Sequence, residues 1–136
     1  SQKDLEKVLK EMGHRFWPQR AERIVKAREH QNHLKNLMNQ DSKKAREWLV
    51  ENIYGMGFKE ASHFLRNIGR KDVAIVDFHI VDLLNREGLI EKPKTISPKK
   101  YLEIEGVLKG LGEKLEMNLA ELDLYLWYIE TGKVLK

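Results

Sequence analysis

Two titratable residues stand where they could act on a ligand. Lys59 comes two residues after a glycine-bracketed turn, Gly55-Met56-Gly57, and Asp77 follows 18 residues later. Two glycines around one residue allow a hairpin with a positive φ angle, or a close approach of the backbone to a ligand. A lysine at this place can contact a phosphate, or its neutral amine can act as a nucleophile. The aspartate can cap a helix, or its carboxylate can stabilise positive charge and assist proton transfer.

The turn lies between two stretches with the apolar spacing of helices. Before it, an amphipathic stretch that Asp41 or Ser42 can cap runs to Ile53. After it, apolar residues at helical spacing predict a second helix that ends at Gly69. The sequence therefore predicts a helix-hairpin-helix motif over about residues 42–69. Unpaired amides at the start of its second helix suit a phosphate.

The rest of the chain predicts further helices and an all-α fold, a compact helical domain with six or seven helices over residues 1–136. One of them is expected from Pro18 to about Met38. The last begins after Asn118, with Glu121 three residues on as a capping-box pair. Its core stripe is expected to consist of Leu119, Leu122, Leu126 and Ile129.

One short stretch resists the helical pattern. Val73–Val76 is a run of four apolar residues, for which propensity alone favours a strand. A lone four-residue strand has no partner in this chain, so no strand is predicted there.

Composition limits the class of protein. The first 50 residues carry 12 Lys and Arg against 7 Asp and Glu, and the last 36 carry 4 against 7. This asymmetry suits a one-sided footprint for a polyanion, although a solvated basic surface gives similar counts. The chain has no cysteine, which excludes disulfides, thiol catalysis and iron–sulfur clusters. No apolar run approaches a membrane span, so we expect an intracellular protein of the cytoplasm or nucleoid and no membrane partner.

The central stretch resembles the helix-hairpin-helix signature of DNA glycosylases. It is most similar to the archaeal-type second family of bifunctional 8-oxoguanine DNA glycosylase/AP lyases. The matching residues are the hairpin Gly55–Gly57, Lys59, Ala61 and the run Val76–Ile80. The Gly/Pro that usually precedes the aspartate is degenerate here, so the resemblance depends mainly on Lys59 and Asp77. Family members are longer, with additional N-terminal helices, and the chain is compatible with a trimmed or partial form.

The resemblance implies base-excision repair of duplex DNA that contains 8-oxoguanine, by a monomer without a cofactor. Lys59 would attack C1′ of the damaged nucleotide, displace the base and form a Schiff base, after which β-elimination cleaves the strand. Partial burial and the positive end of the helix would favour the neutral amine. Asp77 would keep its cap and stabilise the charge that develops on the sugar.

A flipped purine needs aromatic or apolar walls. We expect Trp127 on one side and Phe16 on the other, with Trp17 as the next candidate. Asp123 could accept a hydrogen bond from the purine edge. The resemblance further implies that the C-terminal carboxylate of Lys136 accepts the N7–H that only the oxidised base carries.

The remaining assignments concern the DNA backbone and metals. Phosphate contacts are expected from Gly55, Met56, Gly57, Phe58, Arg66, Arg70 and Lys71. No metal site is predicted except a monovalent cation that the carbonyls of Ile53 and Gly55 could hold. Two alternatives stay open, a non-catalytic helix-hairpin-helix module that binds duplex DNA and a related glycosylase for a different damaged base.

Overall fold

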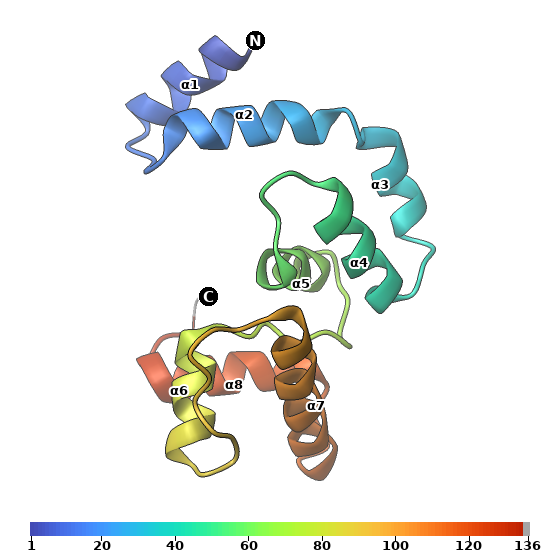
Figure 1. Cartoon of the computed structure of the whole chain (residues 1–136), viewed down its shortest axis with the longest axis vertical. Helices are drawn as coiled ribbons and strands as arrows, with labels where there is room; N and C mark the ends of the chain where they lie inside the picture. The colour runs from blue at the N-terminus through green and yellow to red at the C-terminus, as the bar shows by residue number, and fades with distance from the viewer. Residues whose placement is uncertain (135–136) are drawn as a thin grey trace. The chain divides into compact units, whose positions relative to one another are not determined.

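The computed structural model describes residues 1–134, and within this range it contains eight α-helices and no strand (Figure 1). The predicted all-α fold is therefore confirmed, whereas the predicted number of helices, six or seven, is too low for these residues. The helices are α1 (Gln2–Glu11), α2 (Trp17–Arg28), α3 (Gln31–Leu37), α4 (Ser42–Asn52), α5 (Phe58–Asn67), α6 (Phe78–Arg86), α7 (Pro98–Lys114) and α8 (Leu119–Thr131).

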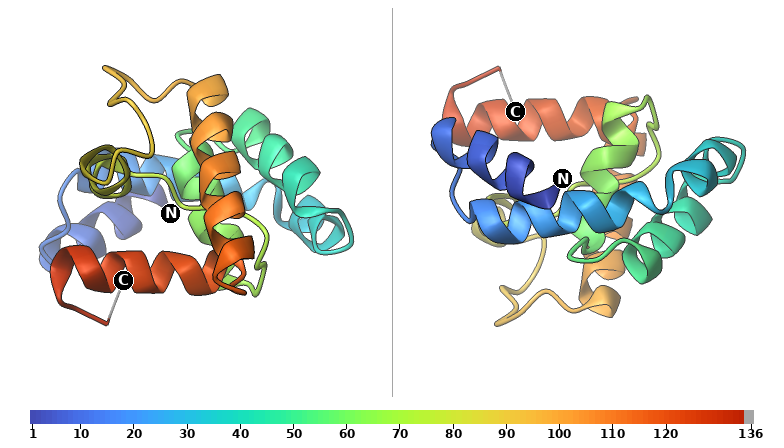
Figure 2. Two further views of the ribbon diagram at one scale, coloured as in Figure 1. Left: turned by 90° about the horizontal axis from the view of Figure 1, so that it is seen from below. Right: turned by 90° about the horizontal axis from the view of Figure 1, so that it is seen from above.

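The chain divides into two compact units. Ser1–Met56 holds α1 to α4, and Gly57–Lys136 holds α5 to α8. In the first unit, α1 and α2 pack against each other (Figures 1 and 2). The assignment of residues 1–136 to one domain remains a prediction.

The predicted helix from Pro18 to Met38 is wrong, because the chain turns at Glu29 and His30 and forms two helices, α2 and α3. In this turn, the amides of Glu29 and His30 donate to carbonyls three residues earlier, at 3.2 and 3.1 Å. The stretch from residue 28 to 33 has no apolar side chain that could hold a continuous helix against a core. After the turn, the rings of His30 and His33 lie 5.5 and 5.9 Å from the ring of Trp48 on α4.

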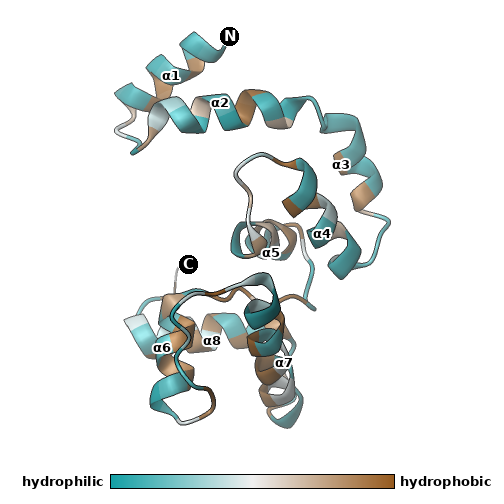
Figure 3. Ribbon diagram, viewed as in Figure 1, coloured by the Kyte–Doolittle hydropathy of each residue, from teal (hydrophilic) through white to brown (hydrophobic). Residues whose placement is uncertain are grey.

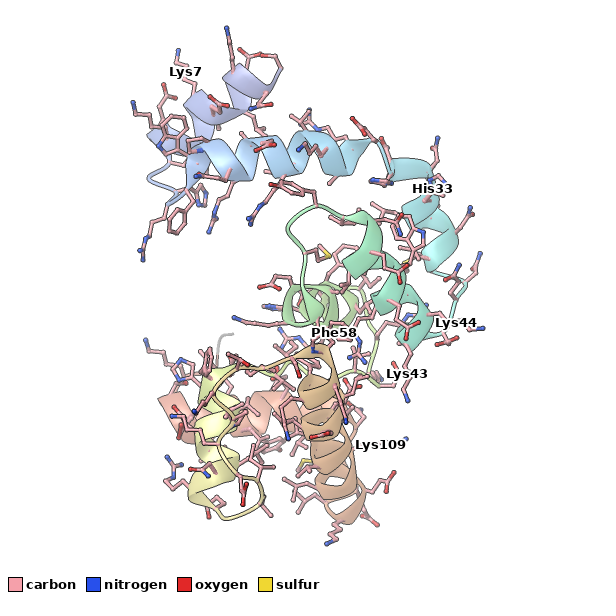
Figure 4. The ribbon with its side chains drawn as sticks, viewed as in Figure 1. Lys7, His33, Lys43, Lys44, Phe58 and Lys109 are labelled. Atoms are coloured by element: carbon pink, nitrogen blue, oxygen red, sulfur yellow. The ribbon has the colours of Figure 1, made fainter. Side chains whose placement is uncertain are left out.

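The second unit contains the main apolar core, to which α6, α7 and α8 contribute. α8 packs against both α6 and α7, and Figure 3 shows hydrophobic residues along all three helices. Phe58, at the first position of α5, joins this core through its ring, 5.5 Å from the ring of Tyr101 (Figure 4). The buried residues of the core are Ala74, Val76, Ile80, Val81, Leu83, Leu84, Tyr101, Ile104, Leu108, Leu119, Leu122 and Leu126.

Side-chain caps mark where α6 and α8 begin. Asp77 accepts a hydrogen bond from the amide of Ile80 at 3.0 Å and so caps α6. Asn118 accepts from the amide of Glu121 at 2.9 Å, and the Glu121 carboxylate accepts from the amide of Asn118 at 3.0 Å. The predicted cap at Asp77 and the predicted capping box before α8 are both confirmed.

Val73–Val76 is a buried extended segment between α5 and α6 rather than a strand. Each of its residues is at most 2% exposed, so its backbone polar groups need partners inside the protein. The amide of Ala74 donates to the Glu105 carboxylate at 2.8 Å. The hydroxyl of Tyr101 donates to the Ala74 carbonyl at 2.6 Å and accepts from the Val76 amide at 3.1 Å. Two side chains of α7 thus do what a neighbouring strand would do.

One expected core residue of α8 lies on the surface. Leu119, Leu122 and Leu126 are at most 8% exposed, whereas Ile129 is 63% exposed. The prediction for Ile129 is therefore wrong. α8 is apolar on several sides, and its outer face leaves Tyr125 exposed as well. None of the helices in residues 1–134 is long and apolar enough to cross a membrane.

Tyr101→Phe should destabilise the second unit by about 2 kcal/mol, because it leaves a buried amide and a buried carbonyl without their partner. Chemical denaturation followed by circular dichroism measures this cost. Tyr125→Phe removes the same hydroxyl from an exposed ring of α8 and should change the free energy of unfolding little. Equal costs for the two variants would contradict the role of Tyr101.

Candidate functional site

The predicted hairpin is a tight turn after the end of α4. Gly55 has a φ of +80°, and the amide of Met56 donates to the carbonyl of Ile53 at 3.1 Å. Gly57 has an extended conformation and is the N-cap of α5. Its amide donates to the Glu60 carboxylate at 3.1 Å, so one amide at the start of α5 already has an anionic partner.

Lys59 lies in the first turn of α5, where backbone N–H groups give the helix its positive end. The residue is exposed, so the expectation of partial burial is wrong for this structure. Solvent therefore reaches its side chain in this structure.

Asp77 ends the connection between α5 and α6, and its side chain is held in place by the fold. One of its carboxylate oxygens accepts from the amide of Ile80, and the residue is only partly exposed. The buried segment that precedes it is fixed by Tyr101 and Glu105. The second carboxylate oxygen sits on a side chain whose position is set by the fold, which favours an electrostatic task.

Trp127 lies next to the helix that Asp77 caps. Its ring is 5.7 Å from the ring of His79, at an interplanar angle of 87°, and Trp127 is partly exposed. His79 is two residues from Asp77 and is exposed. Sequence reasoning did not assign a role to His79, although it lies within the run Val76–Ile80 that carries the family resemblance. The structure thus brings the start of α6 and the candidate stacking residue together.

Asp123 and Arg66 form a buried pair. Nη1 of Arg66 lies 2.5 Å from Oδ2 of Asp123, and their side chains are 11% and 5% exposed. Nη2 of Arg66 lies 3.1 Å from Nε2 of His63. This arrangement connects α5 to α8 inside the unit. The expected purine contact of Asp123 and the expected phosphate contact of Arg66 stay predictions, and the pair gives both residues a structural task.

Phe16 and Trp17 belong to the first unit, at the start of α2. Phe16 is 65% exposed and has a left-handed backbone, with φ 56° and ψ 36°, which is rare for a bulky side chain. The guanidinium of Arg15 lies 5.5 Å from its ring centroid. Trp17 is partly buried, with the Lys10 amine 5.4 Å from its ring. An exposed aromatic ring on a strained backbone is a feature of functional sites, and it favours Phe16 over Trp17 as a stacking residue.

Three other predicted residues follow α5 or end the chain. Arg70 is partly exposed and Lys71 is exposed, and the carbonyl of Lys71 accepts from the amide of Leu119 at 3.0 Å. Lys136 lies outside the described residues. Among residues 1–134, no group of three or more His, Cys, Asp or Glu side chains could hold a metal ion.

Comparison with known proteins gives the family. The family model described as 8-oxoguanine DNA glycosylase matches residues 1–117. The chain belongs to this family. It is 54% identical to an 8-oxoguanine DNA glycosylase/AP lyase of Methanocaldococcus jannaschii over 136 residues, and 52% identical to one of Korarchaeum cryptofilum over 139 residues.

Solved structures of the family have the same fold. A crystal structure of the M. jannaschii 8-oxoguanine glycosylase/lyase in complex with a 15mer DNA containing 8-oxoguanine superposes with a TM-score of 0.94 at 52% identity. It matches over 100% of the present chain and 67% of that chain. The present chain spans 65% of the length of the curated M. jannaschii relative and 66% of that of the K. cryptofilum relative, slightly less than two thirds of each.

Asp123→Asn should destabilise the second unit by about 3 to 5 kcal/mol, because it leaves the Arg66 guanidinium buried without its charge partner. The double variant Arg66→Leu/Asp123→Leu should cost less than the sum of the two single leucine variants, since it removes both charges together. Denaturant unfolding of the four proteins measures the coupling. Glu103→Gln, which breaks the exposed pair with Lys100, should change stability little. Additive costs for Arg66 and Asp123 would show that the pair is not coupled.

Proposed function

We propose that the chain carries the catalytic centre of a bifunctional DNA glycosylase/AP lyase that excises 8-oxoguanine from duplex DNA and then cleaves the strand. The observation that carries this proposal is membership of the 8-oxoguanine DNA glycosylase family, with Lys59 at the start of α5 and Asp77 capping α6 in one compact unit. An enzyme with this substrate works inside the cell, in the cytoplasm or nucleoid.

In the first step, the neutral amine of Lys59 attacks C1′ of the flipped nucleotide, and the bond from C1′ to the base breaks. The bonding electrons leave with the base. The carboxylate of Asp77 stabilises the positive charge that develops on the sugar ring. Because Asp77 also caps α6, the carboxylate needs no reorganisation during the reaction.

In the second step, the sugar ring opens and the nitrogen of Lys59 becomes a protonated Schiff base with C1′. This cation acidifies the proton on C2′, and its removal expels the phosphate oxygen at C3′. The strand is thereby cleaved by β-elimination, and hydrolysis of the Schiff base returns the lysine. Because Lys59 is exposed in the free protein, its side chain is accessible to a bound nucleotide.

Recognition of the base would involve stacking on Trp127, whose position beside His79 and the start of α6 supports this role. Phe16, exposed and strained, is the candidate for the other wall. The exposure of Lys59 also suits the alternative, a module that binds DNA and uses this lysine only as a phosphate contact.

Borohydride reduction should trap a covalent complex between the protein and a duplex that contains one 8-oxoguanine, because the reagent reduces the Schiff base to a stable amine. Lys59→Gln should lose the complex entirely. Lys109→Gln, a lysine of α7 that points away from the ribbon, should keep it (Figure 4). If the wild-type protein gives no complex on this duplex or on one with an abasic site, the enzyme proposal is wrong and the binding module remains. Trapping on the abasic duplex alone would indicate a different damaged base.

Asp77→Asn should slow base excision roughly 100-fold to 1,000-fold, because asparagine keeps the helix cap but not the charge. Single-turnover kinetics on the damaged duplex measure this rate. Asp41→Asn is the matched control, since Asp41 caps α4 through the Lys44 amide at 3.0 Å. Both variants should unfold at nearly the wild-type denaturant concentration. If Asp77→Asn excises the base at the wild-type rate, Asp77 only caps α6 and has no electrostatic role in the reaction.

A further inference from the structure

A side chain of α2 lies directly on the glycine of the hairpin. A Cβ atom at Gly55 would fall 2.4 Å from Nε of Arg23 and 2.7 Å from its Cδ and Cζ. The side chain of Arg23 therefore fills the space that any larger residue at position 55 would need. The φ of +80° explains why the position holds glycine, and a Cβ there would also push the Arg23 side chain aside.

The neighbouring Tyr54 gathers two cations over its ring. The ring is 56% exposed, and its centroid lies 4.2 Å from the Lys26 amine and 5.9 Å from Cζ of Arg23. Arg23 and Lys26 are three residues apart and share one face of α2. Attraction between each cation and the ring face orients both groups beside the hairpin.

Lys26 is paired with a carboxylate, whereas Arg23 has no such partner in the part of the chain that the structure describes. Lys26 donates to the Glu22 carboxylate at 2.7 Å, and this hydrogen bond raises the pKa of the Lys26 amine. Arg23 forms no ion pair with a carboxylate anywhere in residues 1–134. Arg23 is thus an exposed guanidinium beside a second cation at the turn. Its planar set of donors matches the oxygens of a phosphate.

We propose that Arg23, flanked by Lys26 and oriented by Tyr54, binds a phosphate of the DNA backbone beside the hairpin. This inference rests on duplex DNA being the partner under the proposed function. It adds a side-chain contact from α2 to the backbone contacts predicted for the hairpin itself. Tyr54 acts as a positioning residue, because it touches the two cations and not the phosphate.

The test is the salt dependence of binding to an undamaged duplex, measured by fluorescence anisotropy. Each neutralised phosphate contributes about 0.9 to the slope of log affinity against log salt concentration. Arg23→Gln should lower this slope by about one and weaken binding roughly tenfold at low salt. Arg23→Lys should keep the slope, since it keeps the charge. The matched control is Arg28→Gln, an exposed arginine of the same helix about 140° round from Arg23, which should keep the wild-type slope.

Two further pairs of variants test whether Tyr54 and Gly55 affect DNA binding through the position of Arg23 or only through the stability of the fold. Tyr54→Ala should lower the affinity for the duplex, whereas Tyr54→Phe keeps the ring face and should bind like the wild type. Gly55→Ala should lower the slope because its Cβ displaces Arg23. Gly13→Ala introduces the same methyl group at a φ of +72° with nothing within 4 Å, and it should strain the backbone without changing the slope.

If Arg23→Gln and Arg28→Gln give the same slope as the wild type, the inference is overturned. Its failure is distinguishable from that of the proposed function, because borohydride trapping reports on Lys59. Trapping by a protein whose slope does not depend on Arg23 would keep the enzyme and remove this contact. An Arg23-dependent slope without any trapping would keep the contact and remove the enzyme.

Discussion

The segment Val73–Val76 is buried and extended, and it has no neighbouring strand within residues 1–134. Its backbone amides and carbonyls therefore need hydrogen-bond partners from side chains. Tyr101 and Glu105, both on α7, supply partners for the amides of Ala74 and Val76 and for the carbonyl of Ala74. The same contacts fix where the segment ends, and therefore where Asp77 stands and where α6 begins. The position of the candidate carboxylate thus depends on two side chains that have no part in the proposed chemistry. Loss of either one should loosen the site as well as the core.

Local signals in the sequence were sufficient for most of the helices. A cap such as Asp77 acts within one turn of its own helix, so its effect can be read without knowing the rest of the fold. The break between α2 and α3 falls in a polar stretch, residues 28–33, and His30 and His33 after it contact Trp48, which lies in another helix. Periodicity along α2 contains no information about that ring. For this reason the sequence predicted one long helix where the structure has two.

The candidate site divides in the same way. Lys59 and the hairpin follow one another in the chain, so their combination was visible in the sequence, and with Asp77 it carried the family resemblance. The pair of Arg66 and Asp123 joins residues 57 positions apart, and nothing in the local pattern distinguishes a buried arginine from an exposed one. Ile129 is apolar but exposed. Because α8 is apolar on several sides, its sequence does not tell which of these sides the packing of the unit buries.

Phe16 has a consequence for any attempt to make this protein more heat-resistant. Its left-handed backbone costs a bulky residue on the order of 1 to 2 kcal/mol, a strain that glycine would not have. The exposed phenyl ring offsets little of this cost through packing, because 65% of the residue remains accessible to solvent. A selection for melting temperature alone would therefore drive position 16 to glycine. The same substitution would remove the ring that we propose for stacking, so stability and function oppose each other at this one residue.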